Sequence, residues 1–384
     1  MNILEIFKQL IESSGFMALT WQQAVMIGVS FIFLFLAIVK KFEPLLLLPI
    51  AFGMLLANLP EAGLMQPGPT LLESGVLYII YQGVKSSVFP CLIFLGVGAM
   101  TDFGPLLANP SSLLLGGAAQ LGIYVAFVIS IATGLFTPAQ AAAIGIIGGA
   151  DGPTAIFLAT RIASELLGPI AVAAYSYMAL VPIVQPFAIR LVTTKKERRI
   201  RMPAKPARPV TKTTRILFPI IVTFLVGLIS PASVSLVGFL MFGNLLRECG
   251  VLGNLSDTAQ TSLANLITLL LGITISFSMR ADAFVRIDTL MIMGIGLIAF
   301  IFDTIGGVLF AKFMNLFLKT KINPMIGAAG ISAFPMSSRV VQKLAMEEEK
   351  GNIILMHAVG ANVSGQIASV IAGGLVIKLV SQYL

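Results

Sequence analysis

Long apolar blocks separated by short polar segments make up most of this chain, and they constrain its fold more than any other feature. Roughly 20 consecutive apolar residues are enough for one helical crossing of a bilayer. Of the 384 residues, 57% are hydrophobic and only 11% are charged, a composition that soluble domains of this length do not have. The sequence therefore predicts an all-α polytopic membrane protein. The blocks lie at about residues 22–39, 44–60, 76–100, 112–134, 139–160, 168–192, 216–241, 262–279, 288–318, 326–338 and 353–384.

Several of these blocks are too short to cross a bilayer. We therefore expect about nine transmembrane helices plus two interrupted or re-entrant segments that enter the membrane without a simple crossing. The predicted organisation has three parts. These are a first membrane half at 1–192 with an interrupted segment at 145–161, a basic linker at 193–215, and a second membrane half at 216–384 with an interrupted segment at 323–343.

The two halves look like distant copies of each other. FGPLL at 103–107 has a counterpart in FGNLL at 242–246, and GIIGGADGPT at 145–154 has one in GAAGISAFPMSSR at 327–339. Paired apolar segments that glycine and proline interrupt, in matching halves, are typical of a binding site between structural repeats. Chance similarity between glycine-rich apolar segments is the alternative.

The net charge of +8 comes mostly from residues 195–215, which hold nine Lys or Arg and one Glu. Short loops rich in Lys and Arg stay on the cytoplasmic side, so this loop is expected to be cytoplasmic. Pro203, Pro206 and Pro209 predict an extended linker there. Its charge has two interpretations, which are simple control of topology and contact with an acidic partner subunit or anionic lipid.

Signals of secretion or of metal binding are weak. Met1–Thr20 lacks the pattern of a cleavable signal peptide. Cys91 and Cys249 lie in or beside apolar blocks and do not suggest disulfides. His357 is the one histidine, has no Cys or carboxylate cluster around it, and is expected to pack rather than to bind a metal.

Asp151 is a single carboxylate inside the apolar run GIIGGADGPTAIFLATR at 145–161. A charge at membrane depth costs roughly 3 kcal/mol or more, so such a residue usually serves a function. The neighbouring glycines and Pro153 predict a helix break. A break frees backbone carbonyls that, with the hydroxyl of Thr154, can bind a small cation. The sequence thus predicts a sodium or proton site, and a merely kinked packing helix is the alternative.

Other polar residues inside apolar blocks are weaker candidates. Tyr175 and Tyr177 lie in the middle of a block, near two prolines, where one of them could serve the site. Arg339 could bind a carboxylate, neutralise Asp151, or be an ordinary arginine at the cytoplasmic edge. Close helix packing explains Asn362 and Ser364 at least as well as ion binding does. The remaining members of these sets are Asn323, Ser332, Ser337, Ser338 and Asp303.

Four stretches carry a more specific similarity: GGADGPTAIF at 148–157, FGNLLRECGV at 242–251, NLITLLLGITISF at 265–277 and NPMIGAAGISAFPMSSRVVQK at 323–343. Together they resemble the beta subunits of sodium-pumping, biotin-dependent decarboxylases. These complexes act on oxaloacetate, methylmalonyl-CoA, glutaconyl-CoA or malonate. The resemblance implies a subunit that decarboxylates carboxybiotin and exports sodium while a proton is taken up.

The resemblance also implies roles for individual residues. Asp151, Tyr177 and Arg339 would be catalytic, and the latter two would contact carboxybiotin. A Tyr hydroxyl or a carboxylic acid in a low-dielectric site is a suitable donor for the proton that the ureido nitrogen needs as CO2 leaves. The implied sodium ligands are Asp151, Asn323, Gly327 and Ser332, and the hydroxyl of Thr154 beside Asp151 joins them as a predicted ligand.

Further subunits follow from the same resemblance. It implies carboxyltransferase and biotin carrier subunits, a small membrane subunit, and a homotrimer of this chain in a bacterial or archaeal inner membrane. It also implies two inverted repeats, as in elevator-type transporters. The sequence has no Met-Lys-Met pattern that would accept biotin, so biotin is expected to arrive as carboxybiotin on a partner subunit.

Two other classes of protein remain open on the residues alone. A sodium/proton or sodium/carboxylate secondary transporter without chemistry would also have broken helices and paired repeats. Tyr177 and Arg339 favour the decarboxylase, because a simple cation exchanger does not need them. A structural membrane anchor would need no charge at depth, and Asp151 argues against it.

Overall fold

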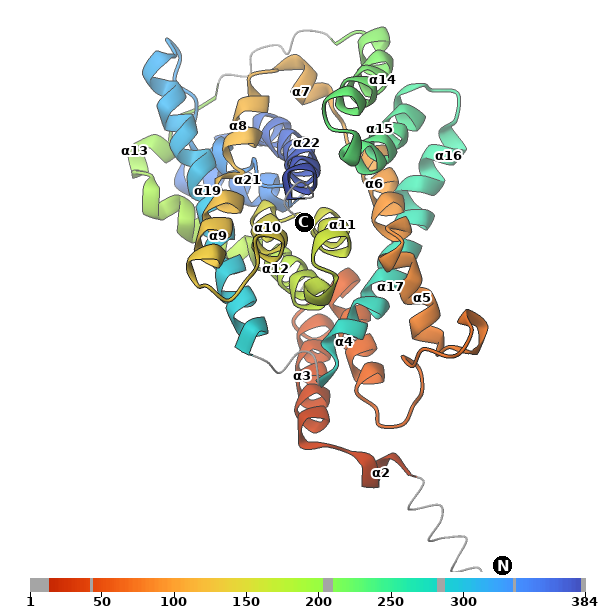
Figure 1. Ribbon diagram of the computed structural model, residues 1–384. Coiled ribbons are helices and arrows are strands. Elements are labelled where there is room, and N and C mark those ends of the chain that lie inside the picture. The colour runs from red at the N-terminus through yellow and green to blue at the C-terminus, as the bar shows by residue number, and fades with distance from the viewer. Residues whose placement is uncertain (1–13, 42–43, 203–209, 282–286, 334–335, 381–384) are drawn as a thin grey trace, which may run out of the picture. The chain divides into compact units, whose positions relative to one another are not determined.

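The computed structural model describes residues 14–41, 44–202, 210–281, 287–333 and 336–380, and across these ranges it is helical and contains no strand (Figure 1). The predicted all-α class is confirmed. The elements of the first half are α2 (Gly15–Ala18), α3 (Trp21–Ile38), α4 (Pro44–Ala57), η1 (Leu71–Glu73), α5 (Val76–Lys85), α6 (Val88–Met100), α7 (Gly104–Ala108), α8 (Ser112–Ala118), α9 (Leu121–Ala132), α10 (Pro138–Gly145), η2 (Ile146–Gly149), α11 (Gly152–Ile162), η3 (Ser164–Leu166) and α12 (Leu167–Val192).

The second half continues with another set of helices. They are α13 (Lys195–Arg198), α14 (Lys212–Ile229), η4 (Pro231–Ser233), α15 (Val234–Glu248), α16 (Gly253–Thr258), η5 (Ala259–Leu263), α17 (Ala264–Ile275), η6 (Ser276–Met279), α19 (Ile287–Phe317), α20 (Met325–Ala328), α21 (Met336–Glu348) and α22 (Leu355–Val380).

Six helices within the described ranges are long and apolar enough to cross a membrane, and the number reaches eight if each of two bent helix pairs is one span. Shorter apolar helices also occur at Leu47–Ala57 and Pro138–Gly149. The chain is therefore a multi-pass membrane protein. The predicted number of nine spans and the inverted repeats stay predictions.

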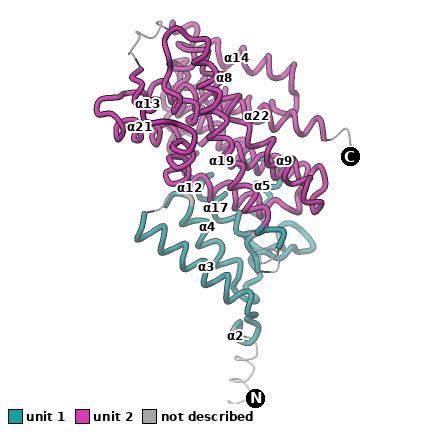
Figure 2. Tube along the Cα trace, turned by 90° about the vertical axis from the view of Figure 1, so that its left-hand side faces the viewer, with its two compact units in different colours: residues 1–89, 265–290 teal, residues 90–264, 291–384 magenta. Residues whose placement is uncertain are grey.

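The chain forms two compact units (Figure 2). Unit 1 comprises residues 1–89 and 265–290, and unit 2 comprises residues 90–264 and 291–384. Unit 2 draws on both predicted membrane halves, so the halves are interleaved within it and do not form separate bodies. The boundaries of the two halves and of the linker stay predictions.

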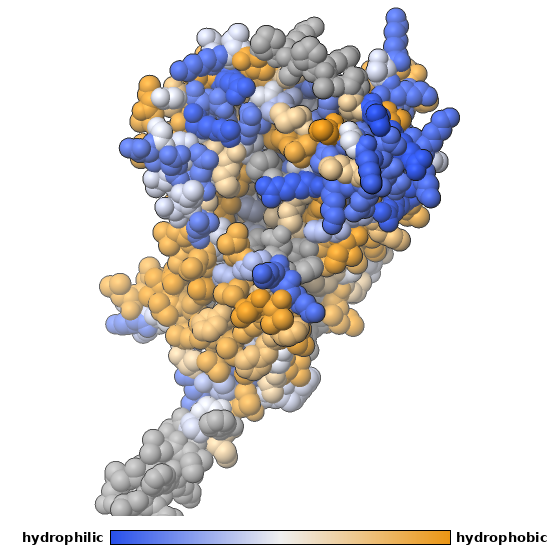
Figure 3. Space-filling view, turned by 180° about the vertical axis from the view of Figure 1, so that it is seen from behind, coloured by the Kyte–Doolittle hydropathy of each residue, from blue (hydrophilic) through white to orange (hydrophobic). Residues whose placement is uncertain are grey.

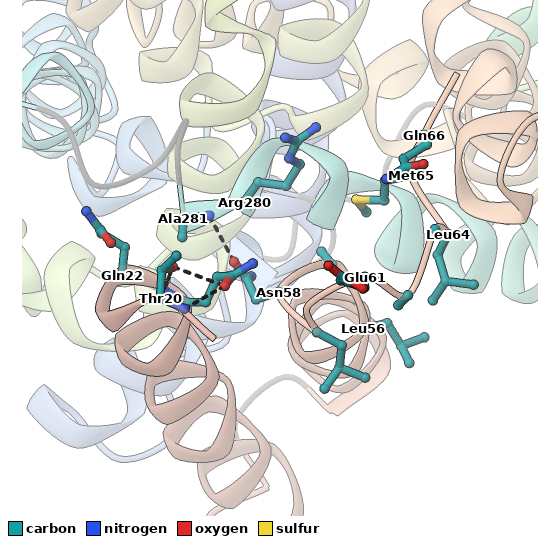
Figure 4. Close-up of a pocket in the computed structure, with 15 residues that line it drawn as sticks. Thr20, Gln22, Leu56, Asn58, Glu61, Leu64, Met65, Gln66, Arg280 and Ala281 are labelled. Carbon is teal, nitrogen blue, oxygen red and sulfur yellow. Dashed lines mark hydrogen bonds between the residues drawn. The ribbon is translucent and has the colours of Figure 1, made fainter. Parts of the chain in front are cut away.

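Unit 1 is built around the helices α3 and α4, which pack against each other. The buried amide of Asn58 ties the end of α4 to a distant part of the chain: its Nδ2 donates to the carbonyl of Met279 at 2.9 Å, and its Oδ1 accepts from the N–H of Ala281 at 2.9 Å. A pocket lies beside this junction, with Thr20, Asn58 and Arg280 among the residues that line it (Figure 4).

Unit 2 is organised around α22, which α8, α10, α11 and α21 surround (Figure 1). Small residues allow this close packing, as is usual between membrane helices. A Cβ on Gly365 of α22 would overlap the carbonyl oxygen of Gly330, and a Cβ on Gly307 of α19 would overlap that of Gly327. The second interrupted segment is therefore held by backbone contacts with α19 and α22.

Residues 193–202 form an ordered polar surface with α21. The buried guanidinium of Arg198 lies 2.8 Å from the carboxylate of Glu348, and Arg201 pairs with Glu349 at 2.7 Å. Partial burial would raise the pKa of Glu197, but hydrogen bonds from Thr194 and Lys312 outweigh it and lower that pKa. Figure 3 shows hydrophilic residues gathered where α13 and α21 lie.

The expectation of an extended linker is therefore wrong for residues 195–198, which form α13. Its polar groups are satisfied locally, because Thr194 and Glu197 form a capping box. The prolines at 203, 206 and 209 lie outside the described residues.

The contact between Gly307 and Gly327 generates a prediction about stability. Gly307→Ala should lower the melting temperature of the detergent-solubilised chain by several degrees, because its methyl group would push α19 away from α20, and overpacking of this kind costs about 1–3 kcal/mol. Gly294→Ala is the matched control on the same helix, since a Cβ there meets nothing within 4 Å. Equal melting temperatures for the two variants would contradict the contact.

Candidate functional site

The first interrupted segment breaks at Ala150 and Asp151. The helix α10 continues into the turn η2, and Ala150 then adopts a left-handed conformation with φ 52° and ψ 40°. A left-handed alanine costs about 1 kcal/mol, so surrounding contacts must hold it. Asp151 follows as the N-cap of α11, with Pro153 in the first turn of that helix. The predicted helix break is confirmed, and it turns the carboxylate toward the start of α11.

The buried carboxylate of Asp151 accepts hydrogen bonds from α11 and from α22. Thr154 donates from its backbone N–H to Oδ1 at 3.2 Å and from its hydroxyl to Oδ2 at 2.8 Å. Ser369, which lies on α22, donates its hydroxyl to Oδ2 at 2.9 Å. The positive end of the α11 dipole also favours a negative charge here. The structure thus brings Asp151 and Thr154 together, as expected from the sequence.

The second interrupted segment meets the first at this point. The N–H of Ser332 donates to the carbonyl of Gly149 at 3.0 Å, and Ser332 Oγ lies 2.8 Å from Ser369 Oγ. Ser332 therefore reaches Asp151 through one intervening hydroxyl. Helix breaks from the two halves of the sequence meet at one carboxylate.

The helix α22 presents a polar face to this junction that the sequence reasoning treated as packing. Asn362 donates from Nδ2 to the carbonyl of Ile331 at 2.6 Å. Its Oδ1 and the Oε1 of Gln366 are buried and have no hydrogen-bond partner among the described residues. Asn362, Gln366 and Ser369 are spaced by four and three residues, so they share one helix face. This spacing is the feature of the sequence that could have identified Ser369 as a residue of the site.

Only one of the two candidate tyrosines lies at the Asp151 loop. A Cβ on Gly152 would lie 2.6 Å from the ring of Tyr175, and the hydroxyl of Tyr175 is buried without a partner in the part of the chain that the structure describes. Tyr177 instead donates its hydroxyl to the carbonyl of Met293 on α19. Residues two positions apart on a helix point in different directions, so Tyr175 and Tyr177 face different neighbours.

Asn323 and Gly327 lie nearer the start of the second interrupted segment. Asn323 donates from Nδ2 to the carbonyls of Arg198 and Ile200, both at 2.9 Å, and its Oδ1 accepts from the N–H of Met325 at 3.1 Å. The carbonyl of Gly327 accepts from the N–H of Gly330 at 3.0 Å. Both residues already have hydrogen-bond partners within the protein, and their predicted sodium binding stays a prediction.

Arg339 lies on α21, where its side chain is exposed and lines a surface groove with Gln342, Lys343 and Glu347. Asp151 is buried, and no ion pair joins the two in the described ranges. Neutralisation of Asp151 by Arg339 is therefore absent from this conformation. Contact with an incoming carboxylate at the surface stays a prediction.

The atoms around Asp151 suit a hard monovalent cation. They are a carboxylate and the hydroxyls of Thr154 and Ser369, all oxygen, which is the ligand type that such cations prefer. No group of three or more His, Cys, Asp or Glu that could hold a metal ion occurs among the described residues. Interrupted membrane helices that meet at one buried carboxylate define the class of ion-coupled, multi-pass membrane proteins.

Comparison with known proteins agrees with this class. Residues 22–380 match the family model of the Na+-transporting oxaloacetate decarboxylase beta subunit. The methylmalonyl-CoA decarboxylase subunit beta of Propionigenium modestum is 51% identical over 98% of this chain and 100% of its own length. The glutaconyl-CoA decarboxylase subunit beta of Acidaminococcus fermentans is 50% identical over 96% of both chains. The oxaloacetate decarboxylase beta chain of Klebsiella pneumoniae is 47% identical, over 98% of this chain and 99% of its own.

The chain belongs to the family of beta subunits of Na+-transporting decarboxylases. It is thus a membrane subunit of a sodium-translocating decarboxylase and works in a complex with other subunits. The resemblance inferred from the sequence motifs is confirmed.

The Ser369 contact generates a prediction about sodium affinity. Ser369→Ala should weaken sodium binding about tenfold, because it removes a hydroxyl oxygen that can turn its lone pairs to the ion, and one contact with a charged group is worth roughly 1.5 kcal/mol or more. The measurement is the sodium concentration that half-saturates the rise in melting temperature. Ser364→Ala, on the same helix, is the control, since that hydroxyl bonds to the carbonyl of Leu113. If both variants bind sodium as the wild type does, Ser369 has no part in the site.

Proposed function

We propose that this chain decarboxylates carboxybiotin, which a partner carrier domain delivers, and couples the reaction to outward sodium transport with proton uptake. The observation that carries the proposal is the buried carboxylate of Asp151, which Thr154 and Ser369 bind where the two interrupted segments meet. Sodium and carboxybiotin are then the cargo and the substrate of the chain, and biotin itself stays on another subunit.

Asp151 serves as the group that sodium and the proton share. A carboxylate oxygen that binds a sodium ion cannot also hold a proton, so occupation by one excludes the other. The hydroxyls of Thr154 and Ser369 can rotate, and they donate to the carboxylate or turn their lone pairs to a cation. Ser332 adds a further hydroxyl oxygen to the site, because it is hydrogen-bonded to Ser369. We also propose Asn323 and Gly327 as sodium ligands.

The chemical step removes CO2 from a carboxylated ureido nitrogen. The N–C bond to the carboxyl group breaks, its electron pair stays on the nitrogen, CO2 leaves, and a proton adds to the nitrogen. Proton donation by a positioned side chain contributes about 100-fold or more to such a step. We propose Tyr177 as the donor and Arg339 as the residue that orients the carboxylate, since a guanidinium binds a carboxylate bidentately.

The exposed position of Arg339 fits a substrate that arrives from the polar surface of α13 and α21. We propose that the biotin carrier docks on this surface, which the positive-inside pattern assigns to the cytoplasm. The proposed complex contains carboxyltransferase and carrier subunits, a small membrane subunit and three copies of this chain, in a bacterial or archaeal inner membrane.

A secondary transporter without chemistry is the second candidate. The broken helices and the single carboxylate fit it equally well. Only the residues proposed for catalysis, Tyr177 and Arg339, separate the two functions.

The primary test measures sodium-dependent loss of CO2 from free carboxybiotin by the purified chain in liposomes. Asp151→Asn should abolish the sodium-dependent turnover, because the amide that replaces the carboxylate carries no charge to hold either cation. Asp257→Asn is the control, since that carboxylate is exposed on α16, and it should behave as the wild type. Sodium flux driven by a proton gradient, without turnover in the wild type, would identify an antiporter instead.

The two tyrosines can be separated by removal of one hydroxyl at a time. If Tyr177 supplies the proton, Tyr177→Phe should lower kcat about 100-fold and leave the sodium concentration for half-maximal rate unchanged. Tyr175→Phe is the matched control on the same helix and should lose much less. The reverse result would make Tyr175 the donor, and its unpartnered hydroxyl beside Gly152 would then explain why.

A further inference from the structure

A cavity of about 380 Å³ lies in unit 2, at the end of α19, and the function proposed above does not use it. Its walls come from α8, the last turn of α19 with the loop that follows, the start of the second interrupted segment and the first turns of α22. Of these, α8 packs against α22 (Figure 1). The volume of the cavity is that of a site for a small molecule or part of one.

The charged side chains that line this cavity are basic. Lys319 and Lys321 lie in the loop after α19, are exposed, and form no ion pair within the described ranges. Lys312 of α19 differs from them, because it pairs with Glu197 at 3.0 Å. No Asp or Glu is among the described residues that line the cavity. A cavity lined by one sign of charge attracts the opposite sign, so this one favours an anionic ligand.

Hydrogen-bond donors lie beside the two lysines. Ser111 and Thr320 bring hydroxyls to the lining, and Asn109 brings an amide. His357, the one histidine of the chain, is half-buried and lines the same cavity. Ammonium, hydroxyl and amide groups all donate to phosphate oxygens, and an ammonium group does so with added charge. The polar part of the cavity therefore suits a phosphate group.

The rest of the lining is apolar and continues onto the outer surface of the helices. Leu115 and Ile326 are buried core residues that line the cavity. Leu318 also lines it and is exposed, as are Phe317 beside it and Leu114 on α8. Exposed apolar side chains on membrane helices face lipid chains, which are as apolar as they are. The cavity thus has a basic rim next to a surface that faces lipid.

Contacts with the basic linker indicate the side of the membrane on which this cavity lies. Met202, at the end of the described part of the linker, lines the cavity, and its sulfur accepts from the N–H of Asn323 at 3.3 Å. The side chain of Asn323 also donates to the carbonyl of Ile200. The positive-inside pattern assigns the linker to the cytoplasm, and with it the cavity. Anionic lipids of the cytoplasmic leaflet attract basic groups at this position.

We propose that this cavity binds an anionic phospholipid of the cytoplasmic leaflet. The phosphate contacts Lys319 and Lys321, and the acyl chains lie over Leu318 and the exposed apolar side chains of α8 and α19. A soluble phosphate would leave the apolar wall unused. The bound lipid rests against Ile322 and Ile326 and so holds the start of the second interrupted segment. The inference rests on the cytoplasmic position of the linker and does not depend on carboxybiotin or sodium.

The test is binding of phosphatidylglycerol to the full-length chain in a neutral detergent, counted by native mass spectrometry. The wild type should bind one phosphatidylglycerol more tightly than phosphatidylcholine, which has no net charge. Lys319→Ala/Lys321→Ala should weaken that binding about 30-fold, because each lysine near an anionic headgroup contributes roughly fivefold. Lys195→Ala/Lys196→Ala is the matched control and should bind as the wild type does. It removes the same charge from exposed residues of α13 that do not line the cavity.

The four lysines are exposed, so both double variants should melt at the wild-type temperature when lipid is absent. Equal weakening in the two double variants would overturn the proposal, because the net charge of the surface would then attract the lipid without a site. Displacement of the lipid by an equal concentration of glycerol 3-phosphate would also overturn it and make the cavity a site for a soluble anion. Neither result bears on the proposed function, since these measurements use no carboxybiotin and no sodium.

Discussion

The hydrogen bond from the N–H of Ser332 to the carbonyl of Gly149 joins two helix breaks, and the rest of the site depends on it. A broken helix in an apolar interior leaves backbone groups without partners, which is costly unless another part of the protein supplies them. The first break offers the carbonyl oxygen of Gly149, and the second break offers the N–H of Ser332 that donates to it. Asp151 lies two residues beyond this bond, and its carboxylate can be buried because Thr154 and Ser369 donate to it.

Glycine contacts hold this junction in place. Gly327 approaches Gly307 on α19, and Gly330 approaches Gly365 on α22, at distances that no side chain allows. The second interrupted segment is thereby fixed between two long helices by its backbone. Side-chain packing alone would tolerate shifts that this arrangement does not. The position of Ser332, and through Ser369 that of Asp151, follows from these contacts.

Much of this was predictable from the sequence, because apolar blocks and helix breaks depend on local patterns. The helical class, the break at Asp151 and its link with Thr154 follow from residues that are neighbours in the chain. The partnership of Asp151 with Ser369 does not, since 218 positions separate them. The choice between Tyr175 and Tyr177 also required the structure, because neighbours on other helices decide which tyrosine meets Gly152.

The basic linker shows a different limit of sequence reasoning. Its charges, taken together, predict which side of the membrane the linker faces. They do not reveal which of the charged side chains form ion pairs. Arg198 is buried against Glu348, far along the chain, and the carbonyls of Arg198 and Ile200 hold the amide of Asn323. A charge count treats Arg198 as one of a run of solvated charged residues. In the structure it is buried and forms an ion pair with Glu348.

These contacts bear on how chemistry and sodium transport can be coupled. The second interrupted segment begins at Asn323, against residues 193–202, and reaches the first break at Ser332. Because glycine contacts fix this segment between α19 and α22, its two ends cannot shift independently without loss of those contacts. A carrier that docks, as proposed, on the polar surface at α13 and α21 would therefore act on Asp151 through the ten residues 323–332. We infer that this segment, rather than the long helices around it, links decarboxylation to the sodium site.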